Sequence, residues 1–535
     1  MALLQIDNLR LSIGEAEILK GVSLMLEAGE ILGLVGESGS GKSMTSMSVL
    51  GLLPPGARLA GAIRLDGEDL LKAGEARLRQ LRGADIGFVF QEPMTALNPL
   101  TPIGEQVAEA VRLHRKVGRA EALKVAADAL ARAGLPNDRF PLSRYPHELS
   151  GGQRQRVAIA IATALKPKLL IADEPTTALD VTTQAQILDL LKTLAREDGA
   201  GLILITHDLA VVAEMADQVA ILQAGEVVEA GPTGPLFRNL THPYARRLAA
   251  DAVLAEAAPP VTAEAPAEVL RVEDVVRTYP GPRPAPWAKP QAFTAVDGVS
   301  LSVRAGETMG LVGESGSGKS TLLRAVLGLD ALQGGRISLV GRPFPPSRRS
   351  EARKARRDVQ AVFQDPYGSF DPRWRVADLI AEPFHLMTDA PSGEARRARI
   401  VAMLERVGLD AAAADRFPHQ FSGGQRQRIA IARALITEPK LVVLDEAVSA
   451  LDVTVRAQIL ELLAELSREL GVAYLFVTHD LGVVRATCHR VLVMQNGRIV
   501  EAGETQAVFA DPQHPYTRGL IAATPDLERA LAARA

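Results

Sequence analysis

One eight-residue stretch occurs twice in this 535-residue chain and constrains its fold more than any other feature. GESGSGKS fills Gly36 to Ser43 and returns unchanged at Gly313 to Ser320. Each copy follows a short apolar run and precedes a run of helical pattern, the setting of a phosphate-binding loop of the form G-x-x-x-x-G-K-[ST]. Glycines let successive backbone N–H groups turn toward one anion, and the helix behind them presents the positive end of its dipole. The repeat therefore predicts two strand–loop–helix units that can cradle phosphate.

The two loops supply candidate ligands for a nucleotide and a cation. Lys42 and Lys319 would reach the β- and γ-phosphates, and the hydroxyls of Ser43 and Ser320 would bind Mg²⁺. The predicted nucleotide-binding residues of the loops are Gly36, Glu37, Ser38, Gly39, Ser40, Gly41, Lys42, Ser43 and Met44, and Gly313, Glu314, Ser315, Gly316, Ser317, Gly318, Lys319, Ser320 and Thr321.

Other blocks repeat at nearly the same spacing, so the whole domain is duplicated. LSGGQRQR at Leu149 returns as FSGGQRQR at Phe421, and ITHD around His207 returns as VTHD around His479, both 272 residues later. A chain of this length also exceeds what one hydrophobic core usually serves. We expect a first domain over residues 1–250, an Ala- and Pro-rich linker over 251–267 and a second domain over 268–535.

Short apolar runs that end in polar residues alternate with helical segments in both halves. LLIADE and LILITHD are examples, and a helical pattern over residues 183–197 separates them. Runs of this kind indicate buried parallel strands, so the fold class is α/β. A second amphipathic helical pattern, over residues 103–133, predicts a helical insert.

Composition limits the classes of partner and compartment. The formal net charge is −3 and the pI about 6.4, which argues against a nucleic acid as the main partner. Cys488 is the single cysteine, which excludes disulfides within the chain and a cysteine-bound iron–sulfur cluster. We find no run of 18 uncharged apolar residues and no secretory signal pattern at the start of the sequence, so we expect a cytosolic location.

Polar residues at the ends of predicted strands carry the chemistry. An aspartate that closes a buried strand can hold Mg²⁺, and the glutamate after it can polarise an attacking water as a general base. The repeated histidine suits a contact to the γ-phosphate, and the glutamine of F-Q-[ED]-P suits the metal or the water. The predicted catalytic residues are Glu174, Glu446, His207, His479, Lys42 and Lys319, and the predicted Mg²⁺ ligands are Ser43, Gln91, Asp173, Ser320, Gln364 and Asp445.

The SGGQ blocks predict a second anion-binding helix start in each domain. Each domain already has one such site in its loop, so we expect the block to clamp a nucleotide held by the other domain. The predicted residues are Ser150, Gly151, Gly152 and Gln153, and Ser422, Gly423, Gly424 and Gln425.

This ordered set of motifs resembles the ATP-binding cassette (ABC) ATPases over both halves of the chain. The resemblance implies two tandem P-loop NTPase domains, each with a mostly parallel sheet core, an antiparallel β subdomain and a helical subdomain. It also implies a head-to-tail internal pseudo-dimer with ATP and Mg²⁺ between the loop of one domain and the SGGQ block of the other.

Further segments resemble the ATPases of bacterial peptide and nickel importers. These are QEPMTALNPL at Gln91, QDPYGSFDPR at Gln364, THPYARRL at Thr241 and QHPYTRGL at Gln513. The fused layout is most similar to the importer ATPases for oligopeptides and microcin C. The resemblance implies two transmembrane permease subunits, an extracytoplasmic substrate-binding protein and a peripheral place on the cytoplasmic face of the inner membrane. It leaves open whether the solute is a peptide, nickel or another compound.

The sequence departs from the family pattern at the adenine. An aromatic residue that stacks on the base appears as Tyr279 in the second domain, whereas Leu11 or Ile13 stands there in the first. Two rival functions remain, a tandem cassette ATPase that acts on ribosomes or nucleic acid, and a purely regulatory nucleotide binder.

Overall fold

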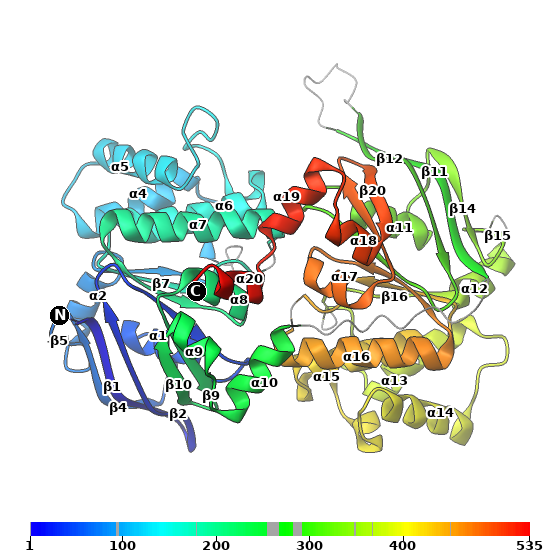
Figure 1. Ribbon diagram of the computed structural model, residues 1–535, viewed down its shortest axis with the longest axis horizontal. Coiled ribbons are helices and arrows are strands. Elements are labelled where there is room, and N and C mark those ends of the chain that lie inside the picture. The colour runs from blue at the N-terminus through cyan, green and yellow to red at the C-terminus, as the bar shows by residue number, and fades with distance from the viewer. Residues whose placement is uncertain are drawn as a thin grey trace.

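The computed structural model describes residues 2–91, 96–177, 179–253, 267–281, 292–346, 349–365, 368–449 and 451–534. The chain forms two lobes that lie side by side, and each lobe has two sheets and a set of helices (Figure 1). The first lobe ends with α10 (Pro243–Ala252), two residues beyond the predicted domain boundary, and the second begins with β11 (Glu268–Pro280). Most of the predicted linker lies outside the described residues.

The central sheet of the first lobe is parallel except at one edge. Its order is β10 (Glu226–Pro232), β9 (Gln218–Gln223), β3 (Ile31–Val35), β8 (Gly201–Ile205), β7 (Leu169–Asp173) and β6 (Ile86–Val89). Only the β10–β9 pair is antiparallel. Every residue of β3, β7 and β8 is buried, as expected for strands covered on both faces. The predicted α/β fold with buried parallel strands is confirmed.

A separate antiparallel sheet covers one side of this core. Its order is β2 (Ala16–Glu27), β1 (Ala2–Ile13), β4 (Ala57–Leu65) and β5 (Glu68–Asp69). Leucines of β1 and β2 share one apolar cluster with the central strands β3 and β8 and with α1 (Lys42–Leu50). The helix behind the first P-loop is therefore fixed between the two sheets.

The remaining helices of the first lobe flank the central sheet or form the helical insert. They are α2 (Glu75–Leu81), α4 (Ile103–His114), α5 (Arg119–Arg132), η1 (Pro146–Glu148), α6 (Gly151–Thr163), α7 (Val181–Asp198), α8 (Leu209–Met215) and α9 (Thr233–Arg238). The helical pattern predicted over 103–133 is two helices, and Gly118 stands at the start of the second. The α4–α5 pair packs on α6, so the insert has its own apolar core.

The second lobe repeats this order. Its antiparallel sheet contains β12 (Ala292–Arg304), β11, β14 (Gly334–Leu339) and β15 (Arg342–Pro343), and its central sheet contains β16 (Val359–Val362), β17 (Leu441–Asp445), β18 (Ala473–Val477), β13 (Thr308–Val312), β19 (Arg490–Gln495) and β20 (Arg498–Glu504). The helices are α11 (Lys319–Val326), α12 (Arg349–Asp358), α13 (Val376–Ala381), η2 (Glu382–Leu386), α14 (Gly393–Arg406), η3 (Ala411–Asp415), η4 (Pro418–Gln420), α15 (Gly423–Leu435), α16 (Val453–Leu470), α17 (Leu481–Thr487), α18 (Thr505–Ala510), α19 (Pro515–Ala523) and α20 (Leu527–Ala532). None of the helices among the described residues combines the length and the apolar character that a membrane span requires.

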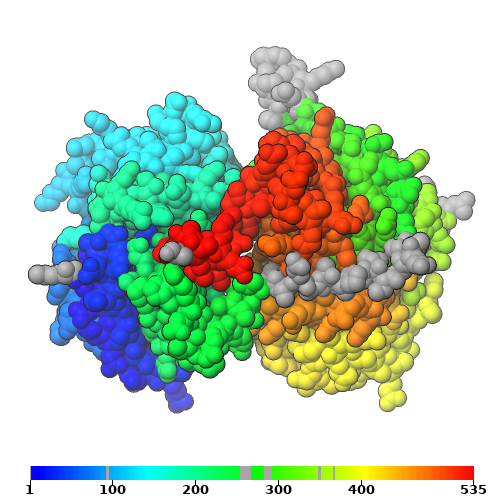
Figure 2. All heavy atoms as spheres, in the orientation of Figure 1, coloured from blue at the N-terminus to red at the C-terminus, as the bar shows by residue number. Residues whose placement is uncertain are grey.

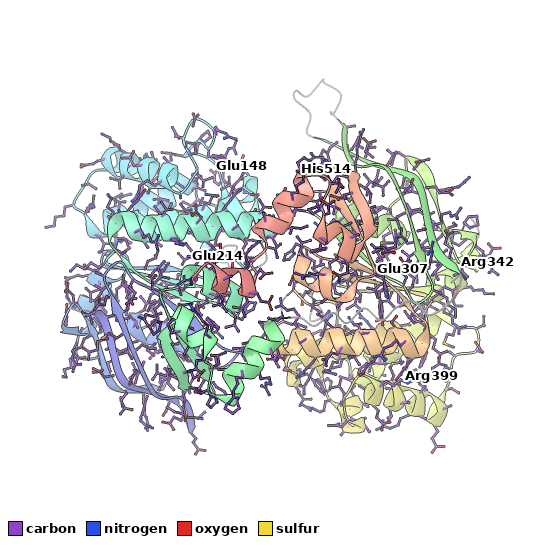
Figure 3. All side chains as sticks on the ribbon, in the orientation of Figure 1. Glu148, Glu214, Glu307, Arg342, Arg399 and His514 are labelled. Carbon is purple, nitrogen blue, oxygen red and sulfur yellow. The ribbon has the colours of Figure 1, made fainter. Side chains whose placement is uncertain are left out.

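The two lobes meet through reciprocal helix contacts. Helix α10 of the first lobe packs on α16 of the second, and α19 of the second packs on α7 of the first (Figure 1). The C-terminal helix α20 then crosses to the first lobe and packs on α8, as Figure 2 shows in red. Leu527 is buried in the apolar core of the first lobe. The Arg534 guanidinium donates at 3.0 Å to the carbonyl of Glu214, the residue labelled beside α20 in Figure 3. The end of the chain thus ties the second lobe to the first.

We expect Leu527→Ala to detach this C-terminal helix. Truncating a buried leucine costs about 2–5 kcal/mol, and Leu527 is the buried leucine of this six-residue helix. Hydrogen exchange of the backbone amides of α20 should accelerate, whereas Leu329→Ala, at a leucine that is 53% exposed, should leave it unchanged. Unchanged exchange in Leu527→Ala would contradict the docking of α20 on α8.

Candidate nucleotide site

The glycines of the P-loops are required by the backbone around them. Gly36 follows β3 with a φ of 154°, and a Cβ there would lie 2.2 Å from the Leu222 carbonyl oxygen. Gly313 has a φ of 152° and would meet the Met494 carbonyl oxygen at the same distance. No side chain fits at either position. The loops therefore pass tightly over their sheets before turning into α1 and α11.

The P-loop lysines curl back over their own loops. Lys42 Nζ donates to the carbonyl oxygens of Gly36 at 2.7 Å and Glu37 at 2.8 Å, and Lys319 Nζ donates to Gly313 at 2.6 Å and Glu314 at 2.9 Å. Burial lowers the pKa of Lys42, although the nearby carboxylates oppose the shift. Each ammonium thus stands over its loop, where the phosphates of a nucleotide would lie.

An aspartate at the end of the neighbouring strand offers a site for a cation. Asp173 closes β7, and its Oδ1 is buried with no hydrogen-bond partner among the described residues. Burial raises the pKa of this carboxyl, and a hydrogen bond from Ser43 opposes the rise. In the second lobe, burial and the charge of Glu446 raise the pKa of Asp445 to about 6. A buried carboxylate oxygen without a partner, beside a serine hydroxyl, fits Mg²⁺ bound through these side chains.

The glutamate after each aspartate is held by the glutamine and the histidine that the sequence predicts for the same site. Glu174 Oε2 accepts from Gln91 Nε2 at 2.8 Å, and its Oε1 lies 3.3 Å from His207 Nδ1. In the second lobe the corresponding distances are 2.7 Å for Gln364 and 3.1 Å for His479 to Glu446. The strands β3, β7 and β8 run parallel and adjacent, so their carboxyl ends bring lysine, aspartate, glutamate and histidine to one edge of the sheet.

The backbone at these glutamates is unusual. Glu174 and Glu446 have φ values of 46° and 48°, which non-glycine residues rarely adopt. Their amides donate to the carbonyl oxygens of Ile205 and Val477 on the adjacent strand, and this contact fixes the turn. The same conformation recurs at other matched positions of the two lobes, Asn8 and Asp274 among them, and at the glutamates it forms the turn that follows the strand.

The two glutamates differ in one partner. Thr177 Oγ1 donates to Glu174 Oε2 at 3.0 Å, whereas Ser449 at the matching position of the second lobe donates to the backbone oxygen of Glu446. Burial would raise the pKa of Glu174, but its hydrogen bonds and the charge of His207 outweigh burial and lower the pKa to about 2. Glu446 also has a lowered pKa, for the same reasons apart from the threonine. Thr177 was not predicted from the sequence, although the repeat keeps a hydroxyl at its position, Ser449, and has Val448 at the position of Thr176.

The SGGQ blocks form helix starts, as their sequence predicts. Ser150 caps α6, since its hydroxyl accepts from the Gln153 amide while Gln153 Oε1 accepts from the Ser150 amide at 3.0 Å. Ser422 and Gln425 cap α15 in the same way. Both blocks follow the helical segments along the chain, and Gly152 lies against Thr183 at the start of α7, because a Cβ there would come within 2.4 Å of the Thr183 methyl group. Their pairing with the loop of the opposite lobe stays a prediction.

Charges of one lobe reach the P-loop of the other. Burial lowers the pKa of Lys42, and the negative charge of Asp452 in the second lobe is one of those that oppose this by raising it. Asp180 of the first lobe raises the pKa of Lys319 in the same way. Both aspartates cap the helix that follows the catalytic strand, α16 and α7 respectively. The start of each of these helices is therefore turned toward the P-loop of the opposite lobe.

The structure also resolves which residue of the first domain matches Tyr279. Asn8 of β1 and Asp274 of β11 both have positive φ, and both lie at a register shift of their strand, so the two residues correspond. Tyr279 comes five residues after Asp274, and Ile13 comes five residues after Asn8, so Tyr279 corresponds to Ile13. Leu11 is fully buried in the core. The Tyr279 hydroxyl donates to Asp330 at 2.8 Å, and the guanidinium of Arg277 covers one ring face at 4.4 Å. Stacking of adenine on Tyr279 stays a prediction, and it would have to use the other face.

Two tyrosines near the P-loops were not predicted as site residues. Tyr244 Oη accepts from the Glu37 amide at 3.0 Å, and Tyr516 Oη accepts from the Glu314 amide at 2.8 Å. The signal was present in the sequence, because HPY recurs at the 272-residue spacing that separates the histidines of the site.

Comparisons with known proteins cover almost the whole chain. The family described as "ABC transporter" matches residues 19–177 and 296–449, and "Oligopeptide/dipeptide transporter, C-terminal region" matches 500–534. The glutathione import ATP-binding proteins GsiA of Escherichia coli O157:H7 and of Shigella flexneri are each 45% identical, over 98% of this chain and 90% of the relative. Among solved structures, cbiO1 of Clostridium perfringens, part of the ABC transporter complex cbiONQ, is 30% identical over 46% of this chain and 91% of its own, with a TM-score of 0.40.

Proposed function

Since this chain belongs to the ABC transporter family, as an importer ATPase of the peptide and glutathione type, we propose that it drives uptake of small peptides of the size of glutathione. The observation that carries the proposal is the 45% identity to glutathione import ATPases across 98% of the chain, which includes both lobes. The solute is the proposed part, because an energy-coupling subunit does not itself bind the transported compound.

We assign the same roles in both lobes. Lys42 and Lys319 would hold the β- and γ-phosphates, and the serine after each lysine would bind Mg²⁺ together with Asp173 or Asp445. When bound, the metal would neutralise charge on the phosphates. Glu174 and Glu446 are ionised at neutral pH, so each can accept a hydrogen bond from the attacking water and polarise it. His207 and His479 would hold the glutamate and contact the γ-phosphate.

The glutamine of each site would link chemistry to the helical insert. In the structure the Gln91 side-chain amide donates to Glu174 Oε2, one of the two carboxylate oxygens that could accept a hydrogen bond from the attacking water. Gln91 stands at the end of β6, where the chain leaves the sheet for the helical segments. If the insert draws Gln91 away, that oxygen keeps its hydrogen bond from Thr177 and gains room to accept one from the water. Gln364 stands in the same relation to Glu446.

We propose that the helical segments receive two transmembrane permease subunits, with an extracytoplasmic binding protein that delivers the solute. The second lobe has a surface cavity of about 730 Å³ in this region, lined by Arg373, Trp374, Arg375, Phe384, His385 and Phe417 among others. In the first lobe, Leu100 and Leu113 are 85% and 75% exposed. Each of these exposed surfaces would receive one permease subunit. This arrangement would place the protein at the cytoplasmic face of the membrane.

The test is co-purification with the permease proteins encoded beside this chain, followed by uptake in proteoliposomes. Trp374→Ala and Leu100→Ala should each reduce co-purification and solute-stimulated ATP hydrolysis, while basal hydrolysis by the isolated chain persists. Met25→Ala, at an exposed methionine of β2 in the antiparallel sheet of the first lobe, is the matched control. Uptake of labelled glutathione or a similar peptide, but not nickel, is the expected result. A chain that associates with no permease, or liposomes that accumulate only nickel, would contradict the proposal.

A further inference from the structure

The HPY segments of the two domains make a contact that the nucleotide chemistry above does not use. In both domains the tyrosine hydroxyl accepts a hydrogen bond from the backbone amide of the second P-loop residue. We propose that Tyr244 and Tyr516 are positioning residues, which hold the P-loop of their own domain in its nucleotide-binding shape and connect it to the opposite lobe. This inference rests on the proposed assignment of the loops as the nucleotide sites.

The contact supports the loop without competing for the ligand. The helix that presents its N-terminus to phosphate begins at Lys42, whereas the amide that the tyrosine accepts from belongs to Glu37, five residues earlier. Tyr244 therefore satisfies a donor at the near end of the loop and leaves the helix-end amides free. Tyr244 is 5% exposed and packs in the apolar core of the first lobe, so its hydroxyl is fixed in place. Burial raises the pKa of Tyr516 to about 12, which keeps that hydroxyl protonated at neutral pH.

Each tyrosine is held by a short network that also repeats. Glu229 Oε1 accepts from the backbone amides of Thr241 at 2.6 Å and His242 at 2.9 Å, and His242 Nδ1 accepts from the Tyr244 amide at 3.3 Å. In the second domain Glu501 accepts from the amides of Gln513 and His514, and His514, labelled in Figure 3, accepts from the Tyr516 amide at 3.2 Å. In both domains a glutamate accepts from the amide of the HPY histidine, and that histidine accepts from the amide of the tyrosine, so each HPY turn holds its tyrosine in place.

The helices that carry these tyrosines also form the contact between lobes. Tyr244 lies on α10, which packs on α16 of the second lobe, and α16 begins directly after Asp452. The negative charge of Asp452 raises the pKa of both Tyr244 and Lys42, as expected for a carboxylate that lies close to both side chains. Tyr516 on α19 stands in the same relation to α7 and Asp180. A shift of one lobe against the other therefore reaches the P-loop through the tyrosine.

The experiment uses the full chain with Tyr244→Phe and Tyr516→Phe, singly and together, which remove only the hydroxyls. We would measure the Kd for a non-hydrolysable ATP analogue with Mg²⁺, the KM and kcat for ATP, the melting temperature and hydrogen exchange of the P-loop amides. The matched control is Tyr474→Phe, because the Tyr474 hydroxyl is buried with no hydrogen-bond partner among the described residues. Loss of one neutral hydrogen bond predicts a rise of about 2- to 10-fold in Kd and KM, little change in kcat and faster exchange in the P-loop.

Three results would bear on the inference. A rise in Kd and KM with a melting temperature like that of Tyr474→Phe would support it. Unchanged Kd and KM in the double variant would overturn it, and so would a rise that appears only with a matching loss of melting temperature, since that reports a structural role. If the unmodified chain fails to bind the analogue, the proposed function itself fails, which separates the two cases.

Discussion

Glu174→Gln together with Glu446→Gln should reduce ATP hydrolysis by about 10²- to 10⁴-fold and leave ATP binding intact, because an amide cannot accept a proton from the attacking water as a carboxylate does. The loss should appear in kcat, and the variant should bind a fluorescent ATP analogue with the affinity of the unmodified chain. Glutamine keeps the size of the side chain and can still bond to Gln91 or His207, so the fold should persist.

Single variants and a surface control complete this test. Glu174→Gln alone and Glu446→Gln alone should each retain part of the hydrolysis, because both lobes hold a full set of side chains. Glu197→Gln, at a carboxylate that is 59% exposed on α7, should change nothing. Undiminished turnover in the double variant would remove these glutamates from the chemistry. Negligible turnover in the unmodified chain would instead favour a purely regulatory nucleotide binder.

Lys42→Met together with Lys319→Met should abolish most ATP binding, in contrast to the glutamate variants. Each lysine supplies a charge-assisted hydrogen bond worth about 1.5–3 kcal/mol, so affinity at each site should fall by roughly 10- to 100-fold. Methionine matches the length of the lysine chain, which limits packing changes at these buried positions. Isothermal titration with Mg²⁺ and ATP measures the effect.

The control for the lysine variants is Lys192→Met, a lysine of α7 outside the P-loops. It should bind ATP with unchanged affinity and melt at the temperature of the unmodified chain. Unchanged affinity in the double P-loop variant would show that the nucleotide binds elsewhere. A comparable drop in the Lys192 variant would mean that the loss is nonspecific.

The central strands and P-loops could be predicted from the sequence because their signals are local. An apolar run of five residues, a glycine loop and a helical run lie within about twenty residues, so no distant contact is needed to recognise them. The helical insert shows the limit of periodicity. The pattern over 103–133 is continuous, but the structure has two helices there. α4 ends at His114 and α5 begins after Gly118, a residue that disfavours the interior of a helix.

Contacts between distant segments could not be predicted in this way. The bond from Glu37 to Tyr244 joins residues 207 positions apart, and only the recurrence of HPY marks the tyrosine. The docking of Leu527 on the first lobe has still less signal, because one leucine in a six-residue helix does not define its partner surface. The match of Tyr279 to Ile13 depends on backbone geometry at Asn8 and Asp274, which the sequence leaves open.

The assignment of roles to the site residues remains a proposal that the geometry supports. The structure brings Lys42, Asp173, Glu174 and His207 to one sheet edge, and it does the same for their counterparts in the second lobe. The reciprocal action of Asp452 on Lys42 and of Asp180 on Lys319 supports the head-to-tail arrangement. The pairing of each SGGQ block with the opposite loop is the part that most needs a direct measurement.

That measurement is nucleotide-dependent cross-linking, by a short bis-maleimide that can span a bound nucleotide, of engineered cysteines at Ser38 and Ser422, made in the Glu174→Gln, Glu446→Gln chain. The native Cys488 is buried and should not interfere. A head-to-tail nucleotide sandwich predicts cross-linking that increases with Mg²⁺ and ATP, and none for the same-lobe pair of Ser38 and Ser150. Absence of the Ser38–Ser422 cross-link with and without nucleotide, in a chain that binds ATP, would contradict the account.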